Sequence, residues 1–312
     1  MKNDKNEQLV VVTGGSGYIA VNIIALLIKE GYPVRTTLRT MSRQDEVQSM
    51  LNQAGVRNVS NLQFVQTDLT KAEGWDEAIE GATYVIHVAS PTPVTRPDAD
   101  QEMIDMAVDG VKHVMNAAKK AGVKRVVLTS ASGAVLAGHG KSHPQLFTEK
   151  GWSNLDSPTI DAYQRSKTIA EREAWKFVNE NGIELSTILP VTVMGPILGK
   201  DFSHSQLVIK NMLEGKIEKH LKLSFDVVDV RDLSVLHILA MKSQEASGQR
   251  FLATSSENIS FKRVAQILID SLGNKASRVK TAEIPNAVAK AAAVGNPTLH
   301  MATSLLGGNM GL

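Results

Sequence analysis

The stretch VVVTGGSGYIAVNIIALLI, residues 10–28, passes from a run of β-branched residues through three glycines into an apolar helical pattern. The glycines permit a tight turn and let the backbone approach a pyrophosphate closely, and the small Ala20 allows the helix to pack closely. The helix that follows aims its free N–H groups at such an anion. A plain turn is the alternative, but the position between a first strand and a first helix favours phosphate binding. The residues that we expect at a dinucleotide cofactor in this segment are Gly14, Ser16, Gly17, Tyr18 and Ile19.

Apolar, β-branched segments continue to alternate with helical patterns as far as residue 190. This alternation predicts an α/β fold, a doubly wound parallel Rossmann sheet with helices on both faces. The strands lack a polar face, which is typical of strands buried on both sides. We predict strands at residues 9–14, 32–38, 61–69, 82–90, 123–130 and 183–190, and helices at residues 17–30, 101–121 and 162–181.

After residue 190 the pattern becomes irregular, with a Pro/Gly-rich loop, one further strand near 225–230 and two further helices. Late additions of this kind to an open α/β sheet commonly form a small substrate-facing lobe. We therefore predict a dinucleotide-binding Rossmann domain made of residues 1–190 and 222–253. A small discontinuous C-terminal substrate lobe would comprise residues 191–221 and 254–312, its tail forming a docked helix and a frayed end rather than a membrane or partner helix.

The composition excludes several classes of function. With 34 basic and 32 acidic residues the net charge is only +2, so a nucleic-acid footprint is not indicated. The chain has no cysteine, which rules out disulfides and thiol chemistry, and its histidines lack spaced carboxylates, so we expect no metal site. The polar N-terminus resembles no signal peptide and no apolar run is long enough to span a membrane. We expect a soluble, cytoplasmic monomer or homodimer that acts on a small molecule.

The second predicted strand decides which dinucleotide would bind. An NAD site usually carries Asp or Glu at the end of this strand, whereas an NADP site uses arginine for the extra phosphate. This chain has Arg39 there and no carboxylate before Asp45, so we predict NADP, bound as NADPH. At the end of the third strand, Asp68 either caps the next helix or accepts from the adenine amino group, and Leu69 beside it is a further expected cofactor contact.

Tyr163 and Lys167 lie four residues apart in the predicted helix 162–181, so both occupy one helical face. A packed tyrosine beside an exposed lysine is the alternative to a chemical role. Other charged residues of this segment, SKTIAEREAWK at 166–176, read as a solvated face with Trp175 turned inward. We read His87, at the end of the fourth strand, as a packed core residue beside the cofactor loop.

The motifs along the chain then support the chemical role. In this order TGGSGYIA, HVASP, VVLTS, YQRSK and ILPVTVMGP resemble the extended short-chain dehydrogenase/reductases, most closely the dihydroflavonol reductase-like aldehyde and ketone reductases. The likeness covers roughly residues 8–270. It implies that hydride from the nicotinamide reduces a carbonyl to an alcohol, with Tyr163 as the proton donor. It also implies that Lys167 holds the nicotinamide ribose and, as a nearby cation, lowers the pKa of Tyr163.

The resemblance places further residues at the cofactor. These are Val88, Ala89 and Ser90 along the cofactor, Pro190 and Val193 against the nicotinamide, and Ser205 near the phosphates. Each of them could equally be loop packing.

The family also has a serine that donates to the substrate oxygen, and here the chain departs from the pattern. Ala131 stands at the usual place, with Ser130 and Ser132 on either side. Neighbours on an extended strand point to opposite faces, so one of these serines replaces the usual one only if the backbone turns, as Gly133 permits. We favour Ser132 over Ser130, and neither acting is the third alternative.

Two rival functions remain. A nucleotide-sugar epimerase or dehydratase with bound NAD shares the expected fold, but Arg39 and the sequence ASGA, where a dehydratase has an Asp-Glu pair, argue against it. A non-catalytic NADP-binding sensor protein would usually lack the tyrosine, which is present here.

Overall fold

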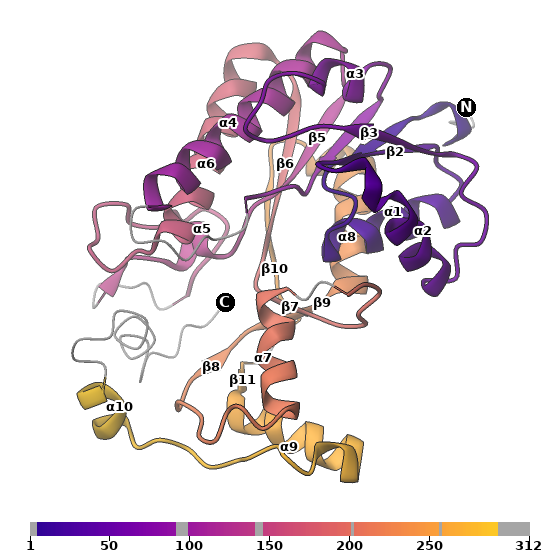
Figure 1. Ribbon diagram of the computed structural model, residues 1–312. Helices are drawn as coiled ribbons and strands as arrows, with labels where there is room; N and C mark the ends of the chain where they lie inside the picture. Colours follow the sequence, from indigo (N-terminus) through magenta and orange to yellow (C-terminus); the bar gives the residue numbers. More distant parts are fainter. Residues whose placement is uncertain (1–4, 92–98, 141–145, 201–202, 256–257, 293–312) are drawn as a thin grey trace.

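A seven-stranded parallel sheet forms the centre of the molecule (Figure 1). The computed structural model describes residues 5–91, 99–140, 146–200, 203–255 and 258–292. The strands of this sheet, in spatial order, are β10 (Arg250–Ala253), β6 (Glu184–Pro190), β5 (Arg125–Thr129), β4 (Tyr84–His87), β1 (Val10–Val12), β2 (Val34–Leu38) and β3 (Leu62–Gln66). The order reverses between β1 and β4, the point at which an open α/β sheet binds its ligand.

Helices cover both faces of the sheet, as Figure 1 shows. One face packs against α1 (Tyr18–Lys29), α2 (Gln44–Gln53) and α8 (Val230–Lys242). The other packs against α3 (Trp75–Ile79), α4 (Ala99–Lys120) and α6 (Ala162–Asn181). The three valines of β1 are fully buried, which explains why this strand shows no polar alternation. The predicted doubly wound α/β fold is confirmed, although β10 joins the sheet without having been predicted as a strand.

The remaining elements are short. Two small sheets pair β7 (Thr192–Met194) with β9 (Val227–Asp229) and β8 (Ser224–Phe225) with β11 (Ile259–Ser260). Three helices accompany them: α7 (His204–Leu213), α9 (Phe261–Leu272) and α10 (Asn286–Ala292). The short helix α5 (Gly133–Leu136) follows β5, and 3-10 turns occur at Lys5–Glu7, Met41–Arg43, Gln244–Ala246 and Gly273–Ala276.

The segment expected as a loop after residue 190 contains β7, because its partner β9 supplies hydrogen bonds that the local sequence does not reveal. Elements of residues 222–253 contact both parts of the fold. β8 and β9 pair with strands of the small sheets, whereas β10 pairs with β6. The division into two domains stays a prediction, and the tail beyond residue 292 lies outside the described residues.

Buried Arg125, the first residue of β5, fixes α8 against the sheet. Its guanidinium donates to Glu184 Oε2 (2.8 Å from Nε) and to the carbonyl oxygens of Ala240 and Ser243 at the C-terminus of α8. A cation at this end complements the helix dipole and occupies carbonyls that would otherwise lack donors. In the part of the chain that the structure describes, no helix combines the length and apolarity that a membrane crossing requires.

Candidate functional site

The glycine turn between β1 and α1 leaves no room for side chains. Gly14 has a φ of 72° and its N–H donates to Thr37 Oγ1 at 3.1 Å. A Cβ on Gly15 would lie 2.2 Å from Thr36 Oγ1. The N-cap of α1 is Gly17, and no side chain caps the N–H groups of the first helical turn. A tight backbone cradle with uncapped N–H groups fits the pyrophosphate of a dinucleotide.

The end of β4 packs directly on this turn. Thr13 Oγ1 accepts from the N–H groups of Val88 and Ala89, each at 3.0 Å, so its own hydrogen goes to His87 Nδ1 at 2.8 Å. Ala89 Cα lies 3.1 Å from the Cβ position of Gly14. Burial, with a smaller contribution from the charge of Lys167, lowers the pKa of His87 to about 3. The reading of His87 as a packed residue beside the cofactor loop is therefore confirmed.

Arg39 directly follows β2 and is exposed, while Asp68 follows β3. Asp68 Oδ1 accepts from the N–H (2.9 Å) and the hydroxyl (2.8 Å) of Thr70. These two bonds, and then the charge of Arg39, lower the pKa of Asp68. The first alternative for Asp68 is wrong: it closes a turn, and the N-cap of α3 is Gly74.

Helix α6 carries the tyrosine and the lysine. Asp161 caps its start by accepting from the N–H of Gln164 at 2.7 Å, and Gly182, in the left-handed region with a φ of 72°, ends it. The cap fixes where the helix begins, so the tyrosine falls in its first turn. Tyr163 keeps 38% of its surface exposed, whereas Lys167, one turn further on, is buried.

The charges on α6 differ from the expectation. Burial lowers the pKa of Lys167 to about 8, which Glu171 opposes, and Lys167 Nζ donates to the carbonyl of Thr129 at 3.2 Å. Partial burial and the carboxylate of Asp161 raise the pKa of Tyr163. The expected lowering by Lys167 is therefore wrong for the protein alone, because the loss of water around the phenol dominates and the ammonium is directed to β5.

The two candidate serines have different surroundings. Ser130 is buried and donates its hydroxyl hydrogen to Glu171 Oε2 at 2.6 Å. Ser132 is half-buried at the N-cap of α5 and its side chain caps no N–H group, while its own N–H donates to the carbonyl of Pro190 at 3.0 Å. A Cβ on Gly133 would lie 3.1 Å from Gln164 Cγ, so this corner packs against the first turn of α6.

Glu171 corrects the prediction of a solvated face for the charges of residues 166–176. Its side chain has no exposed surface, although Arg172 and Lys176 beside it are exposed as expected. Spacing could have identified it, since Glu171 continues the four-residue repeat of Tyr163 and Lys167 and so lies on the same helical face.

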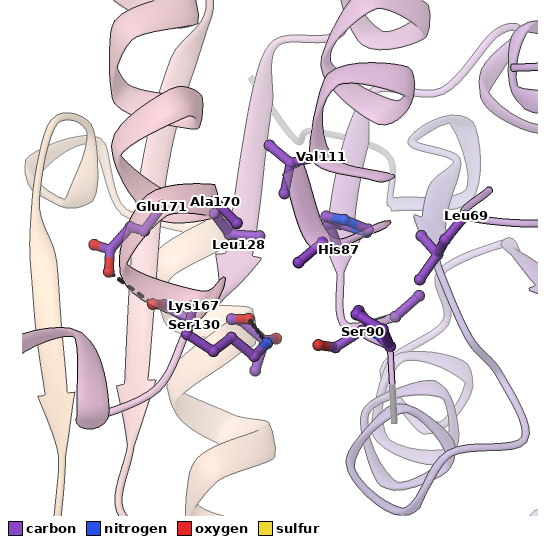
Figure 2. Close-up of a pocket in the computed structure, with 13 residues that line it drawn as sticks. Leu69, His87, Ser90, Val111, Leu128, Ser130, Lys167, Ala170 and Glu171 are labelled. Carbon is purple, nitrogen blue, oxygen red and sulfur yellow. Dashed lines mark hydrogen bonds between the residues drawn. The ribbon is translucent and has the colours of Figure 1, made fainter. Parts of the chain in front are cut away.

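A small cavity of about 20 Å³ lies between the ends of β4 and β5 and the helices α4 and α6. Figure 2 shows Lys167 facing Ser90 and His87 across it. The expected site residues that line it are Leu69, Ala89, Ser90, Ser130 and Lys167. Tyr163 and Ser132 are outside this lining, and no group of metal-ligating side chains occurs among the described residues.

Further expected residues belong to the glycine turn, α1, β7 and α7. Ser205 Oγ donates to the carbonyl of Val193 at 2.7 Å, which joins α7 to β7. Ser16 and Tyr18 line a second, smaller cavity beside α2 and residues 197–199. Burial raises the pKa of Tyr18 to about 12, with the Gln206 side chain opposing the rise. Ile19 packs against the core beneath α1, so its contact with a cofactor would be limited.

The chain resembles known proteins over most of its length. A model of the 3-beta hydroxysteroid dehydrogenase/isomerase family matches residues 11–282. Cinnamoyl-CoA reductase 1 of Arabidopsis thaliana is 35% identical over 251 residues, which cover 80% of this chain and 71% of the relative. An anthocyanidin reductase of Vitis vinifera is 32% identical over 262 residues, which cover 80% and 77%.

The fold matches solved structures as well. The yeast methylglyoxal/isovaleraldehyde reductase Gre2 complexed with NADPH superimposes with a TM-score of 0.77 at 27% identity, over 96% of this chain and 98% of that one. The span matched by the family model includes both the glycine turn and α6.

Proposed function

Since the chain belongs to the 3-beta hydroxysteroid dehydrogenase/isomerase family, and is an extended short-chain dehydrogenase/reductase of the dihydroflavonol reductase type, we propose that it reduces an aldehyde or ketone to an alcohol with NADPH. One observation carries the proposal. Ala89, which packs against Gly14 of the glycine turn, and Lys167 of α6 line the same cavity. The cradle for the pyrophosphate and the face of the tyrosine-bearing helix therefore flank one site.

The bound nicotinamide would supply the hydride to the carbonyl carbon. Tyr163 donates its hydroxyl proton to the carbonyl oxygen, which gives the alcohol and leaves a phenolate to be reprotonated from solvent. Its raised pKa suits this direction, because the phenol stays protonated at neutral pH. The ammonium of Lys167 would hold the nicotinamide ribose through its remaining hydrogens.

Ser132 is the better candidate for the donor to the substrate oxygen. Its side chain is half-buried and caps no helix, whereas the hydroxyl hydrogen of Ser130 is already donated to Glu171. A hydroxyl whose hydrogen is committed to a buried carboxylate cannot also donate to a substrate.

Arg39 supports NADPH over NADH, because an exposed guanidinium at the end of β2 can bind the phosphate on the adenine ribose. The complex of the Gre2 reductase with NADPH is in line with this choice. A contact between Asp68 and the adenine amino group stays a proposal, because the bonds that the structure shows for its Oδ1 are those that close the turn to Thr70.

The proposal is tested by following NADPH oxidation with a panel of aldehydes and ketones. We expect Tyr163→Phe to lower kcat by about 100- to 10,000-fold, the usual contribution of a general acid, without weakening NADPH binding. Tyr32→Phe is the matched control, because Tyr32 is buried in the core under α1. Undiminished turnover by Tyr163→Phe would remove this residue from the mechanism.

A further inference from the structure

Glu171 is a fully buried charge directly behind the site. Its carboxylate accepts from four side chains. Three come from β5, β6 and β10: the Ser130 hydroxyl (2.6 Å), the Thr187 hydroxyl (2.8 Å) and the Arg250 guanidinium (2.7 Å from Nε), and the fourth is the indole N–H of Trp175 (3.2 Å) on α6 itself. A charge placed so deep is stable only when its oxygens are saturated in this way. Such saturation fixes the carboxylate in one position.

Arg250 completes a pair that joins the edge of the sheet to α6. Its Nη1 donates to the carbonyls of Glu149 and Gly151, and its guanidinium packs on the ring of Trp152 at 3.8 Å from the centroid. The residue after Trp152 is Ser153, whose Oγ donates to the carbonyl of Gly133 at 2.7 Å. The pair is therefore linked to Ser130 before Ser132, through Glu171, and to Gly133 after it, through residues 151–153.

Glu171 also acts on Lys167. The two residues are one helical turn apart, and both line the cavity, in which Glu171 supplies the only carboxylate among the lining residues that the structure describes. Figure 2 shows Glu171, Ser130 and Lys167 on the same side of the cavity, where Glu171 accepts from Ser130 and Lys167 donates to the carbonyl of Thr129. A nearby carboxylate favours the ammonium form of a buried lysine. In agreement, Glu171 opposes the effect of burial on the pKa of Lys167.

Three further titratable groups among the described residues lie near Lys167 and are uncharged at neutral pH. His87 faces it from β4 with a pKa of about 3, and burial lowers the pKa of His237 of α8, which contacts Thr129, to about 4. Tyr163, on the same helix, has a raised pKa. Among the described residues, Glu171 therefore supplies the charge that favours the ammonium of Lys167, and Arg250 is bonded to that carboxylate.

We propose that the buried Glu171–Arg250 pair positions Lys167 and the corner between β5 and α5, and that Glu171, held in place by Arg250, keeps Lys167 in the ammonium form that binds the cofactor ribose. Glu171 is thus a positioning residue and does not touch substrate. The inference rests on the proposed function, in which Lys167 binds the nicotinamide ribose.

The test is the pH dependence of the NADPH dissociation constant, measured by fluorescence between neutral and alkaline pH. Wild-type binding of NADPH should weaken above a pH of about 8, where Lys167 loses its proton. We call this decline in affinity at high pH the alkaline limb, and Lys167→Met should abolish it. Glu171→Gln should move the limb to lower pH by about one unit, because a carboxylate is lost and Arg250 remains. Arg250→Gln should move it to higher pH, because the carboxylate keeps its donors from Ser130, Thr187 and Trp175.

Opposite shifts separate this role from a structural one, since a merely structural pair would weaken binding in both variants without moving the limb in opposite directions. Glu173→Gln, a partly exposed position on the same helix, is the control and should leave the limb unchanged. If Glu171→Gln does not fold, the inference is tested with Arg250→Gln and with the double variant Glu171→Gln/Arg250→Gln, in which both charges are removed. The alkaline limb of the double variant should lie at a lower pH than that of Arg250→Gln.

A limb that stays in place, or moves the same way in both single variants, overturns the inference while leaving turnover by the wild-type protein intact. Loss of turnover in wild type together with the opposite shifts would instead contradict only the proposed reaction. Failure of wild type to bind NADPH would overturn both.

Discussion

The inner face of α6 lines the cavity directly, whereas the glycine turn packs on Ala89 in its wall, and the two regions are made of different groups. The turn is made of backbone, with neighbouring atoms where side chains would stand, as at Gly15 against Thr36. The face of α6 is made of ionisable side chains whose partners come from β5, β6 and β10. The first region should therefore be sensitive to added atoms, and the second to changes of charge and hydrogen bonding.

The largest expected effect is a loss of folding stability at low pH, which tests the buried histidines beneath both regions. His87 under the turn and His237 under Thr129 have pKa values lowered to about 3 and 4 by burial. The unfolded chain takes up these protons near pH 6.5, so stability is complete above that pH and falls as the pH drops towards the folded values. For His87 the loss is roughly 5 kcal/mol in the free energy of unfolding by the bottom of this range.

Urea unfolding at a series of pH values measures this effect. His87→Asn should flatten the decline below pH 6.5 more than His237→Gln does, because the pKa of His87 is lowered further. An equal decline in wild type and both variants would mean that other groups cause the acid sensitivity.

A hydroxyl deletion sharpens the comparison within the second region. Ser132→Ala should lower kcat by about 100- to 1,000-fold, the usual result of removing a donor to a developing oxyanion. Ser130→Ala is the matched change two residues away, and its main effect should be on stability, because it leaves Glu171 with one donor fewer. Steady-state turnover and thermal unfolding of both variants decide the matter, and a larger rate loss in Ser130→Ala would reverse our choice of serine.

An added methyl group tests the first region. We expect Gly15→Ala to weaken NADPH binding by about 10- to 100-fold, since forcing an atom into a packed site typically costs 1–3 kcal/mol. Thr36→Ala removes the two nearest atoms that the new Cβ would meet, Oγ1 and Cγ2, and leaves Cβ at 3.0 Å, so the double variant should recover part of the affinity. Titration of NADPH into the three variants provides the comparison, and the idea of steric exclusion fails if the second change brings no recovery.

The smallest effect is expected at the exposed end of the cofactor site. Arg39→Ala should weaken NADPH by about 10-fold and leave NADH nearly unchanged, as lost charge-assisted bonds to phosphate predict. Arg57→Ala, in an exposed loop, is the control. Equal weakening of both dinucleotides would rule out a contact between Arg39 and the extra phosphate.

Most of the sheet could be predicted because its signals are local. A run such as Val10–Val12, buried on both faces, and the change to a helical repeat after Gly17 are readable in a few residues. The strand β7 was missed because its pairing depends on β9, more than 30 residues later. The strand β10 was missed as well, since four residues at the sheet edge give too short a pattern.

For the site, the spacing within α6 placed Tyr163 and Lys167 on one face, but it did not reveal the environment of that face. The partner of Glu171 lies 79 residues away at Arg250, so the pattern of charges on the helix resembled an ordinary solvated surface. The direction of the Tyr163 pKa was also missed, because it depends on burial and on Asp161.

The amino-acid sequence by itself determined the doubly wound sheet, the glycine turn and the shared face of tyrosine and lysine, because dihedral preferences and side-chain periodicity act over a few neighbouring residues. Only the tertiary structure decided which charges are buried, which serine donates its hydrogen to a buried carboxylate and how the phenol titrates. Those properties depend on how much water and which distant groups surround each atom, and the chain sets that only when it has folded.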